Sequence, residues 1–210
     1  MIRKVLDRFF NARRAGVHQL SHATRYDRYP ELFSAARELT TIPHPRILSF
    51  GCSSGEETAS LCEYFADATV IGADISDAVL RKAAKRCHGL PGVSFVNTGI
   101  TPLTELEPFD LIFAMSVLCR HKETKAAQNC SAIYPFRNFE STCQDLADRL
   151  RPGGLLVIYN ANYRFTDTAA ARNFTALEIP AVVDAGFVAR FDPSGDRLED
   201  DYRYCVFRKN

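Results

Sequence analysis

The fold of this 210-residue chain is decided by Arg46-Ile47-Leu48-Ser49-Phe50-Gly51-Cys52-Ser53-Ser54-Gly55-Glu56-Glu57. The run before Gly51 has the apolar content of a short buried strand, and a helical pattern starts directly after Gly55. Gly51 allows the backbone to approach a ligand, and Gly55 allows the helix to start close to the sheet. Ligands bind at the carboxyl ends of strands in a doubly wound sheet, so we predict a ligand-binding turn here.

Strand-like and helical runs alternate after this turn. Further strands are expected at residues 69–73, 93–96, 111–114 and 155–159, and helices at 56–66, 76–87 and 138–150. Such alternation predicts an α/β fold with a mostly parallel, doubly wound sheet, because parallel neighbours are joined by helical crossovers. Residues 186–191 and 202–207, joined by a turn over 192–196, predict a C-terminal antiparallel hairpin and bring the sheet to seven strands.

The residues before the sheet predict a helical cap. Apolar side chains from Ile2 to Phe10 recur at helical spacing among basic residues, and a second helix is expected from Pro30 to about Leu39. Between them, residues 24–30 concentrate two arginines and two tyrosines, which predicts a lid, with a solvated surface turn as the alternative. We expect one domain over residues 1–210, with residues 1–44 as the cap and 45–210 as the core.

The amino-acid composition indicates which kinds of binding partner to expect. Lys+Arg number 26 against 25 Asp+Glu, so no basic surface for nucleic acid is expected. No window is apolar enough to span a membrane, and the scattered cysteines without a secretion signal predict a cytoplasmic protein. The spacing of Cys119, His121 and Cys130 matches no common ligand pattern, so we predict no metal site. A small-molecule partner is expected instead.

Asp74 is the strongest single candidate for a residue that binds the ligand. It follows the second strand about twenty residues after the glycine turn, where a carboxylate accepts hydrogen bonds from ribose hydroxyls. The alternative is a helix N-cap, although Ser76 is available for that role. A phosphate ligand is disfavoured because Glu56 and Glu57 would repel it at the helix start, so a cationic or zwitterionic ligand is predicted.

Four motifs together resemble the chemotaxis receptor methyltransferases. They are Gly51-Cys52-Ser53-Ser54-Gly55-Glu56-Glu57, Ala73-Asp74-Ile75-Ser76, Phe109-Asp110-Leu111-Ile112-Phe113 and Leu150-Arg151-Pro152-Gly153-Gly154. The resemblance covers roughly residues 45–160. It implies a class I, Rossmann-like methyltransferase fold and S-adenosylmethionine as the cofactor.

The same resemblance implies the cofactor contacts. The residues concerned are Gly51, Cys52, Ser53, Gly55, Glu56, Asp74, Ile75, Thr98, Gly99, Ile100, Ala114 and Met115. Among them, Asp74 would bind the ribose, residues 98–100 would surround the adenine, and Glu56 would approach the amino-acid end. From the lid, Arg25 or Arg28 is expected to pair with the methionine carboxylate or with an acidic acceptor, because guanidinium geometry suits carboxylates.

The methyl acceptor is expected to be a small molecule, methylated on oxygen or nitrogen. The resembled family carries Arg-Asn after its fourth strand, whereas this chain has Met115-Ser116, which disfavours receptor glutamates. Protein carboxyl methylation and non-catalytic cofactor binding are the alternatives. His121 is the candidate base, against a solvated or structural histidine. The candidate substrate contacts are Tyr26, Tyr134, Asn160, Tyr163 and Arg164, for whose tyrosines core packing is the alternative.

Overall fold

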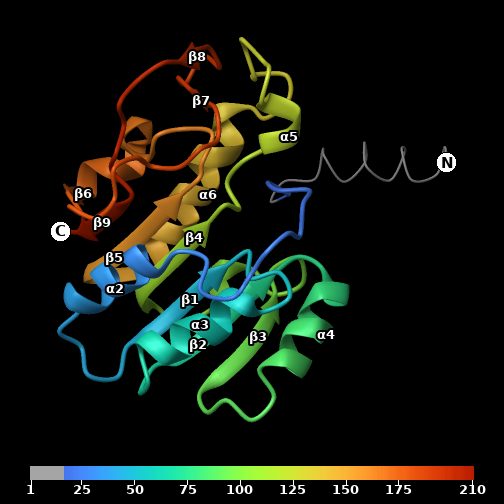
Figure 1. Ribbon diagram of the computed structural model, residues 1–210, viewed down its shortest axis with the longest axis vertical. Coiled ribbons are helices and arrows are strands. Elements are labelled where there is room, and N and C mark those ends of the chain that lie inside the picture. Colours follow the sequence, from blue (N-terminus) through green and yellow to red (C-terminus); the bar gives the residue numbers. More distant parts are fainter. Residues whose placement is uncertain (1–16) are drawn as a thin grey trace, which may run out of the picture.

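Seven strands form one sheet in a computed structural model that describes residues 17–210, with strand order β3-β2-β1-β4-β5-β9-β6 (Figure 1). The strands are β1 (Arg46–Phe50), β2 (Thr69–Asp74), β3 (Val93–Asn97), β4 (Phe109–Met115), β5 (Leu150–Tyr159), β6 (Phe174–Leu177) and β9 (Val206–Lys209). Strands β1 to β5 pair in parallel, and β9 lies antiparallel between β5 and β6. The predicted fold class is therefore confirmed.

The longer helices lie where the apolar spacing predicts them. They are α2 (Pro30–Glu38), α3 (Glu56–Tyr64), α4 (Asp77–Arg86) and α6 (Phe136–Arg149), with the single turn α5 (His121–Thr124). Short 3₁₀ turns follow at η1 (Leu103–Glu105), η2 (Phe165–Asp167) and η3 (Ala169–Asn173). Pro30 starts α2, where its missing N–H costs nothing, and α2 buries Leu32 and Phe33. The basic helix predicted from Ile2 to Phe10 lies outside the described residues.

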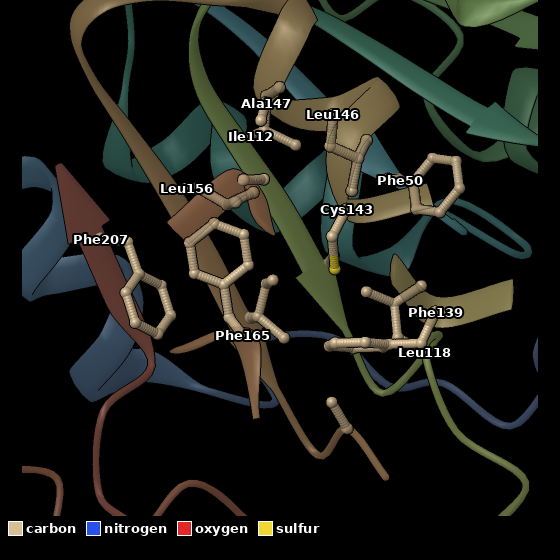
Figure 2. Close-up of a cluster of buried hydrophobic side chains, with 14 of the residues drawn as sticks. Phe50, Ile112, Leu118, Phe139, Cys143, Leu146, Ala147, Leu156, Phe165 and Phe207 are labelled. Carbon is tan, nitrogen blue, oxygen red and sulfur yellow. The ribbon is translucent and has the colours of Figure 1, made fainter. Parts of the chain in front are cut away.

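Two apolar clusters cover the two faces of the sheet. Successive residues of a strand point to opposite faces, so Ile47 and Leu111 pack with α2 and α3 while Leu48 and Ile112 pack with α6. Figure 2 shows the second cluster, in which Phe139, Cys143 and Leu146 of α6 face Ile112 and Leu156 of the sheet, with Phe207 of β9 at its margin. The strands β1, β4 and β5 are thereby held rigidly from both sides.

The C-terminal hairpin is present, but its second arm differs from the prediction. The turn over residues 192–196 joins β7 (Arg190–Phe191) to β8 (Arg197–Leu198), which form a separate two-stranded sheet. The predicted second arm, residues 202–207, instead leads into β9 of the main sheet. Val206 and Phe207 are buried there between β5 and β6, which is a better environment for an apolar pair than a surface hairpin.

Residues 17–29, called here the cover segment, run without helical structure into α2 (Figure 1). His18 holds the segment to the body of the protein, since its Nδ1 lies 2.5 Å from Tyr134 Oη and its Nε2 lies 2.8 Å from Thr142 Oγ1. Nearer the sheet, Arg120 donates to the Val17 carbonyl at 2.6 Å. Within residues 17–210, none of the helices combines the length and apolar character needed to cross a bilayer.

Candidate functional site

A cavity of about 890 Å³ lies between the cover segment and the carboxyl ends of β1, β2 and β4. Its floor includes the residues after β1, the end of β2 and the residues after β4, and its roof is formed by residues 17–25, 28 and 29. This volume is typical of sites that enclose a small organic ligand. The parallel strands all end at this edge of the sheet, which is where ligands bind in doubly wound folds.

The glycine turn after β1 depends on glycine at two positions. Gly51 has φ +76° and Gly55 has φ +89°, a region that side chains with a Cβ rarely adopt. A Cβ on Gly51 would lie 2.4 Å from Val117 Cγ2, and one on Gly55 would lie 2.9 Å from Ala83. Gly51 therefore accommodates the segment after β4 as well as lining the cavity, and Gly55 lets α3 pack closely against α4.

The carboxylate of Asp74 faces this turn from the end of β2. Its Oδ2 accepts a hydrogen bond from the Ser53 N–H at 3.1 Å, and its Oδ1 accepts one from the Ser76 N–H at 3.0 Å. Ser76 is the N-cap residue of α4, so Asp74 does not occupy the capping position itself. Each carboxylate oxygen can accept a second hydrogen bond, which leaves capacity for ribose hydroxyls on the cavity side.

The two glutamates that open α3 have different environments. Glu56 accepts from Ser54 Oγ at 2.7 Å and pairs with Arg86 at 2.6 Å, away from the cavity lining. Glu57 lines the cavity and accepts from Ser49 Oγ at 2.7 Å. Burial raises the pKa of Glu57 to about 8. The hydrogen bond from Ser49 and the positive charge of Arg28 lower this pKa by smaller amounts.

The sequence predicts a cofactor contact for Glu56, whereas the structure places Glu57 in the cavity lining. Consecutive helix residues point about 100° apart, and at the start of α3 the side chain of Glu57 is the one directed to the cavity. The signal that could have identified Glu57 is Ser49, a polar residue inside an otherwise apolar strand. Ser49 is fully buried, and a buried hydroxyl requires a nearby polar partner.

The predicted cofactor residues fall into two groups. Those that line the cavity are Gly51, Cys52, Ser53, Asp74, Ile75, Thr98, Gly99, Met115, Arg25 and Arg28. Ala114 and Gly55 lie outside the lining, and Ile100 is 73% exposed on the surface beyond Gly99. Arg28 donates to the Ala23 carbonyl at 3.2 Å, and its guanidinium lies 5.0 Å from the centre of the Tyr29 ring.

The predicted catalytic and substrate residues are not brought together. His121 begins α5 outside the cavity lining, and its ring contacts that of Phe187 at 5.2 Å between centroids. Tyr26 is 47% exposed, and the nearby carboxylate of Glu63 raises its pKa to about 12. Of the five substrate candidates, Asn160 lies nearest to the site, because it is hydrogen-bonded to the cavity residues Tyr29 and Ser116.

The other substrate candidates contact the protein interior or its outer surface. Tyr134 and Tyr163 are 1% and 2% exposed, and the Tyr163 hydroxyl donates to the Tyr134 carbonyl. Arg164 pairs with Asp167 and Asp200. Within residues 17–210, no three His, Cys, Asp or Glu side chains are grouped so that they could hold a metal ion.

Comparison with known proteins defines the family. Residues 48–156, just over half of the chain, match the family model described as a methyltransferase domain, and the chain belongs to this family. The chain is 31% identical over 173 residues to a trans-aconitate 2-methyltransferase of Deinococcus radiodurans, which covers 80% of this chain and 58% of the relative. A protein of the same name from Acidovorax sp. strain JS42 is 39% identical over 87 residues, 40% of this chain and 33% of the relative. The chain therefore spans less than two thirds of these relatives.

Solved structures share the fold. The N-methyltransferase NodS from Bradyrhizobium japonicum WM9, in complex with S-adenosyl-L-homocysteine, matches with a TM-score of 0.54 and 18% identity over 87% of each chain. TrmN from Thermus thermophilus matches with a TM-score of 0.54 and 18% identity over 88% of this chain and 53% of that one. At such identity the likeness concerns the fold alone.

The class predicted from the sequence is confirmed: this is an S-adenosylmethionine-dependent methyltransferase domain, and S-adenosylmethionine is its cofactor. The residues present fit that molecule. The cavity is large enough for a nucleoside with an amino-acid arm, Asp74 offers acceptors for ribose hydroxyls, and Glu57 offers an acid near a positively charged ligand.

Proposed function

We propose that this chain transfers the methyl group of S-adenosylmethionine to a carboxylate oxygen of a small anionic acceptor. Arg25 and Arg28 are the observation that carries the proposal. Both line the cavity, and within residues 17–210 neither forms an ion pair with a carboxylate. One arginine suits the methionine carboxylate and the other suits an acceptor carboxylate, since guanidinium groups bind carboxylates in a bidentate manner.

The relatives supply a first candidate acceptor. Several are named trans-aconitate 2-methyltransferase, and trans-aconitate carries three carboxylates. A compact tricarboxylate offers a carboxylate to the arginine that does not bind the methionine carboxylate. We therefore take trans-aconitate as the first acceptor to test, and other small di- and tricarboxylates as the next.

The proposed reaction requires alignment more than acid–base chemistry. S-adenosylmethionine, when bound, supplies an activated methyl group on a positively charged sulfur. Asp74 would hold the ribose, Glu57 would face the positive charge, and the cover segment would exclude water and hold the acceptor in line with the methyl group. A carboxylate is already deprotonated at neutral pH, so the reaction needs no general base and no role for His121 is required.

Two further functions remain as alternatives. The Gly51–Glu57 motif keeps the resemblance to chemotaxis receptor methyltransferases, which would make the acceptor a protein glutamate with the same carboxylate chemistry. A cofactor-binding regulator would bind without transferring a methyl group. For any of these, we propose a cytoplasmic setting, which the seven free cysteines support.

Transfer of a radiolabelled methyl group tests the proposal. The protein is incubated with methyl-labelled S-adenosylmethionine and with trans-aconitate, a panel of small carboxylic acids, or a panel of small amines. We expect label in the carboxylate products, released as methanol by alkali because methyl esters hydrolyse in base. Label in alkali-stable amine products, or cofactor binding without transfer to any acceptor, would overturn the proposal.

A further inference from the structure

Three polar side chains form a closed network where the cover segment meets the residues that follow β4 and β5. Tyr29 Oη lies 2.6 Å from Ser116 Oγ, and Asn160 Nδ2 donates to Tyr29 Oη at 3.0 Å and to Ser116 Oγ at 2.9 Å. Tyr29 belongs to the cover segment, Ser116 follows β4 and Asn160 follows β5. Tyr29 and Ser116 line the cavity, while Asn160 is fully buried behind them.

A hydrogen bond from the backbone fixes the orientation of the Asn160 amide. Its Oδ1 accepts the Phe187 N–H at 2.8 Å, so its NH₂ group must face the two hydroxyls. Asn160 and Ser116 have φ values of +56° and +59°, a backbone region that is uncommon for residues other than glycine. Strained backbone of this kind at the ends of two neighbouring strands is typical of functional sites.

Counting protons identifies an unused donor. Both amide protons of Asn160 go to the hydroxyl oxygens, and one hydroxyl proton is shared between Tyr29 and Ser116. The second hydroxyl proton has no acceptor within residues 17–210, and both hydroxyls face the cavity. Burial raises the pKa of Tyr29, so its phenol keeps its proton at neutral pH and the count holds.

We propose that the Tyr29–Ser116 hydroxyl pair donates a hydrogen bond to a carboxylate oxygen of the methyl acceptor, with Asn160 as the positioning residue that directs the free proton into the cavity. This inference rests on the proposed function and deepens it by naming a second contact besides the arginines. Because Tyr29 comes from the cover segment and Ser116 follows β4, the hydroxyl pair exists where these two parts of the chain meet.

The network predicts an unusual mutational pattern. In Tyr29→Phe the Ser116 proton becomes free, and in Ser116→Ala the Tyr29 proton becomes free, so each single variant keeps one donor. The double variant keeps none. In Asn160→Asp, which preserves shape and the bond from the Phe187 N–H, the carboxylate would accept both hydroxyl protons and leave no donor for the acceptor.

The test measures binding of trans-aconitate and of each acid in the panel to the protein saturated with S-adenosyl-L-homocysteine, by calorimetry, together with KM and kcat for methyl transfer. The four variants are compared with wild type and with the matched control Tyr204→Phe/Ser94→Ala, whose hydroxyls lie outside the cavity lining. Thermal unfolding of every variant shows whether it is folded, and its affinity for S-adenosyl-L-homocysteine shows whether the cofactor site is intact.

We expect the single hydroxyl variants to weaken acid binding a few-fold and the double variant and Asn160→Asp to weaken it about 10- to 100-fold, as expected for a hydrogen bond to a charged group. The loss should appear in KM, and the double variant should lose more than the two single losses multiplied. If wild type binds an acid and the double variant binds it equally, the inference is wrong while the proposed function stands. If folded, cofactor-binding wild type binds no acid in the panel, both are overturned.

Discussion

At the residue scale, Glu57 is the acid whose ionisation should respond most strongly to the cofactor. Burial raises its pKa to about 8, so at pH 7 it holds a proton that an exposed glutamate would have lost. A positively charged ligand in the cavity stabilises the carboxylate and lowers this pKa. Binding should therefore release protons at a pH between the lowered pKa and about 8, and progressively fewer above pH 8, where Glu57 is already ionised.

Calorimetry in buffers of different ionisation enthalpy measures this proton. For S-adenosylmethionine at pH 7 we expect proton release, with one proton per molecule bound as the upper limit, by the linkage between binding and ionisation. Glu57→Gln should abolish the release, whereas Glu107→Gln, a change at an exposed glutamate, should keep it. Equal release by wild type and Glu57→Gln would show that Glu57 does not sense the ligand.

Some single residues of the site could be predicted from the sequence, and others could not. Asp74 and Gly51 could be assigned because their positions follow from the strand ends, which the apolar pattern defines. Glu57 and the Tyr29–Ser116–Asn160 network could not, because they depend on which way a side chain points and on contacts between residues up to 131 positions apart. His121 is predicted as the base because it follows β4. Its position in the sequence does not show in which direction its ring points.

At the element scale, the cover segment forms the roof of the cavity. At its start it is anchored by His18, which has both ring nitrogens engaged and is almost fully buried. Burial, assisted by Arg120, lowers the pKa of His18 to about 4, so the ring is neutral at physiological pH. The anchor should therefore weaken only as the pH falls below the ordinary histidine range.

Replacing this anchor should loosen the segment without unfolding the sheet. His18→Ala removes two buried hydrogen bonds, worth about 2 kcal/mol together, so amide hydrogen exchange over residues 17–29 should accelerate by roughly tenfold or more. Exchange in β1 and β4 should change little. His44→Ala, at an exposed position, is the control. Unchanged exchange in the segment would mean that His18 is not what holds it.

The elements themselves were largely predictable. The strand over residues 46–50 and the helix from Pro30 follow from local apolar spacing and from proline, and both lie where expected. The second arm of the hairpin does not lie where expected. Its position could not be predicted, because residues 202–207 are apolar enough for either a surface hairpin or the main sheet. Only the burial of Val206 and Phe207 between β5 and β6 decides between these pairings.

At the scale of the whole molecule, one sheet carries the residues that form the floor of the cavity. We propose one domain over residues 1–210, with a cap of residues 1–44 on a core of residues 45–210. The two apolar clusters on opposite faces of the sheet support this proposal for residues 17–210, the part of the chain that the structure describes. The glycine turn, Asp74 and the residues after β4 are all held at one edge of the sheet. A floor fixed by the sheet and a roof held by side-chain hydrogen bonds suit an enzyme that aligns two ligands.

Binding of the cofactor in this cavity should depend most strongly on the carboxylate of Asp74. Calorimetric titration with S-adenosyl-L-homocysteine tests it most directly, comparing wild type, Asp74→Asn and the exposed control Asp67→Asn. Loss of charged hydrogen bonds to the ribose should raise the Kd of Asp74→Asn by about 10- to 100-fold, while Asp67→Asn should match wild type. Equal affinity in all three proteins, each folded by circular dichroism, would show that Asp74 does not bind the cofactor.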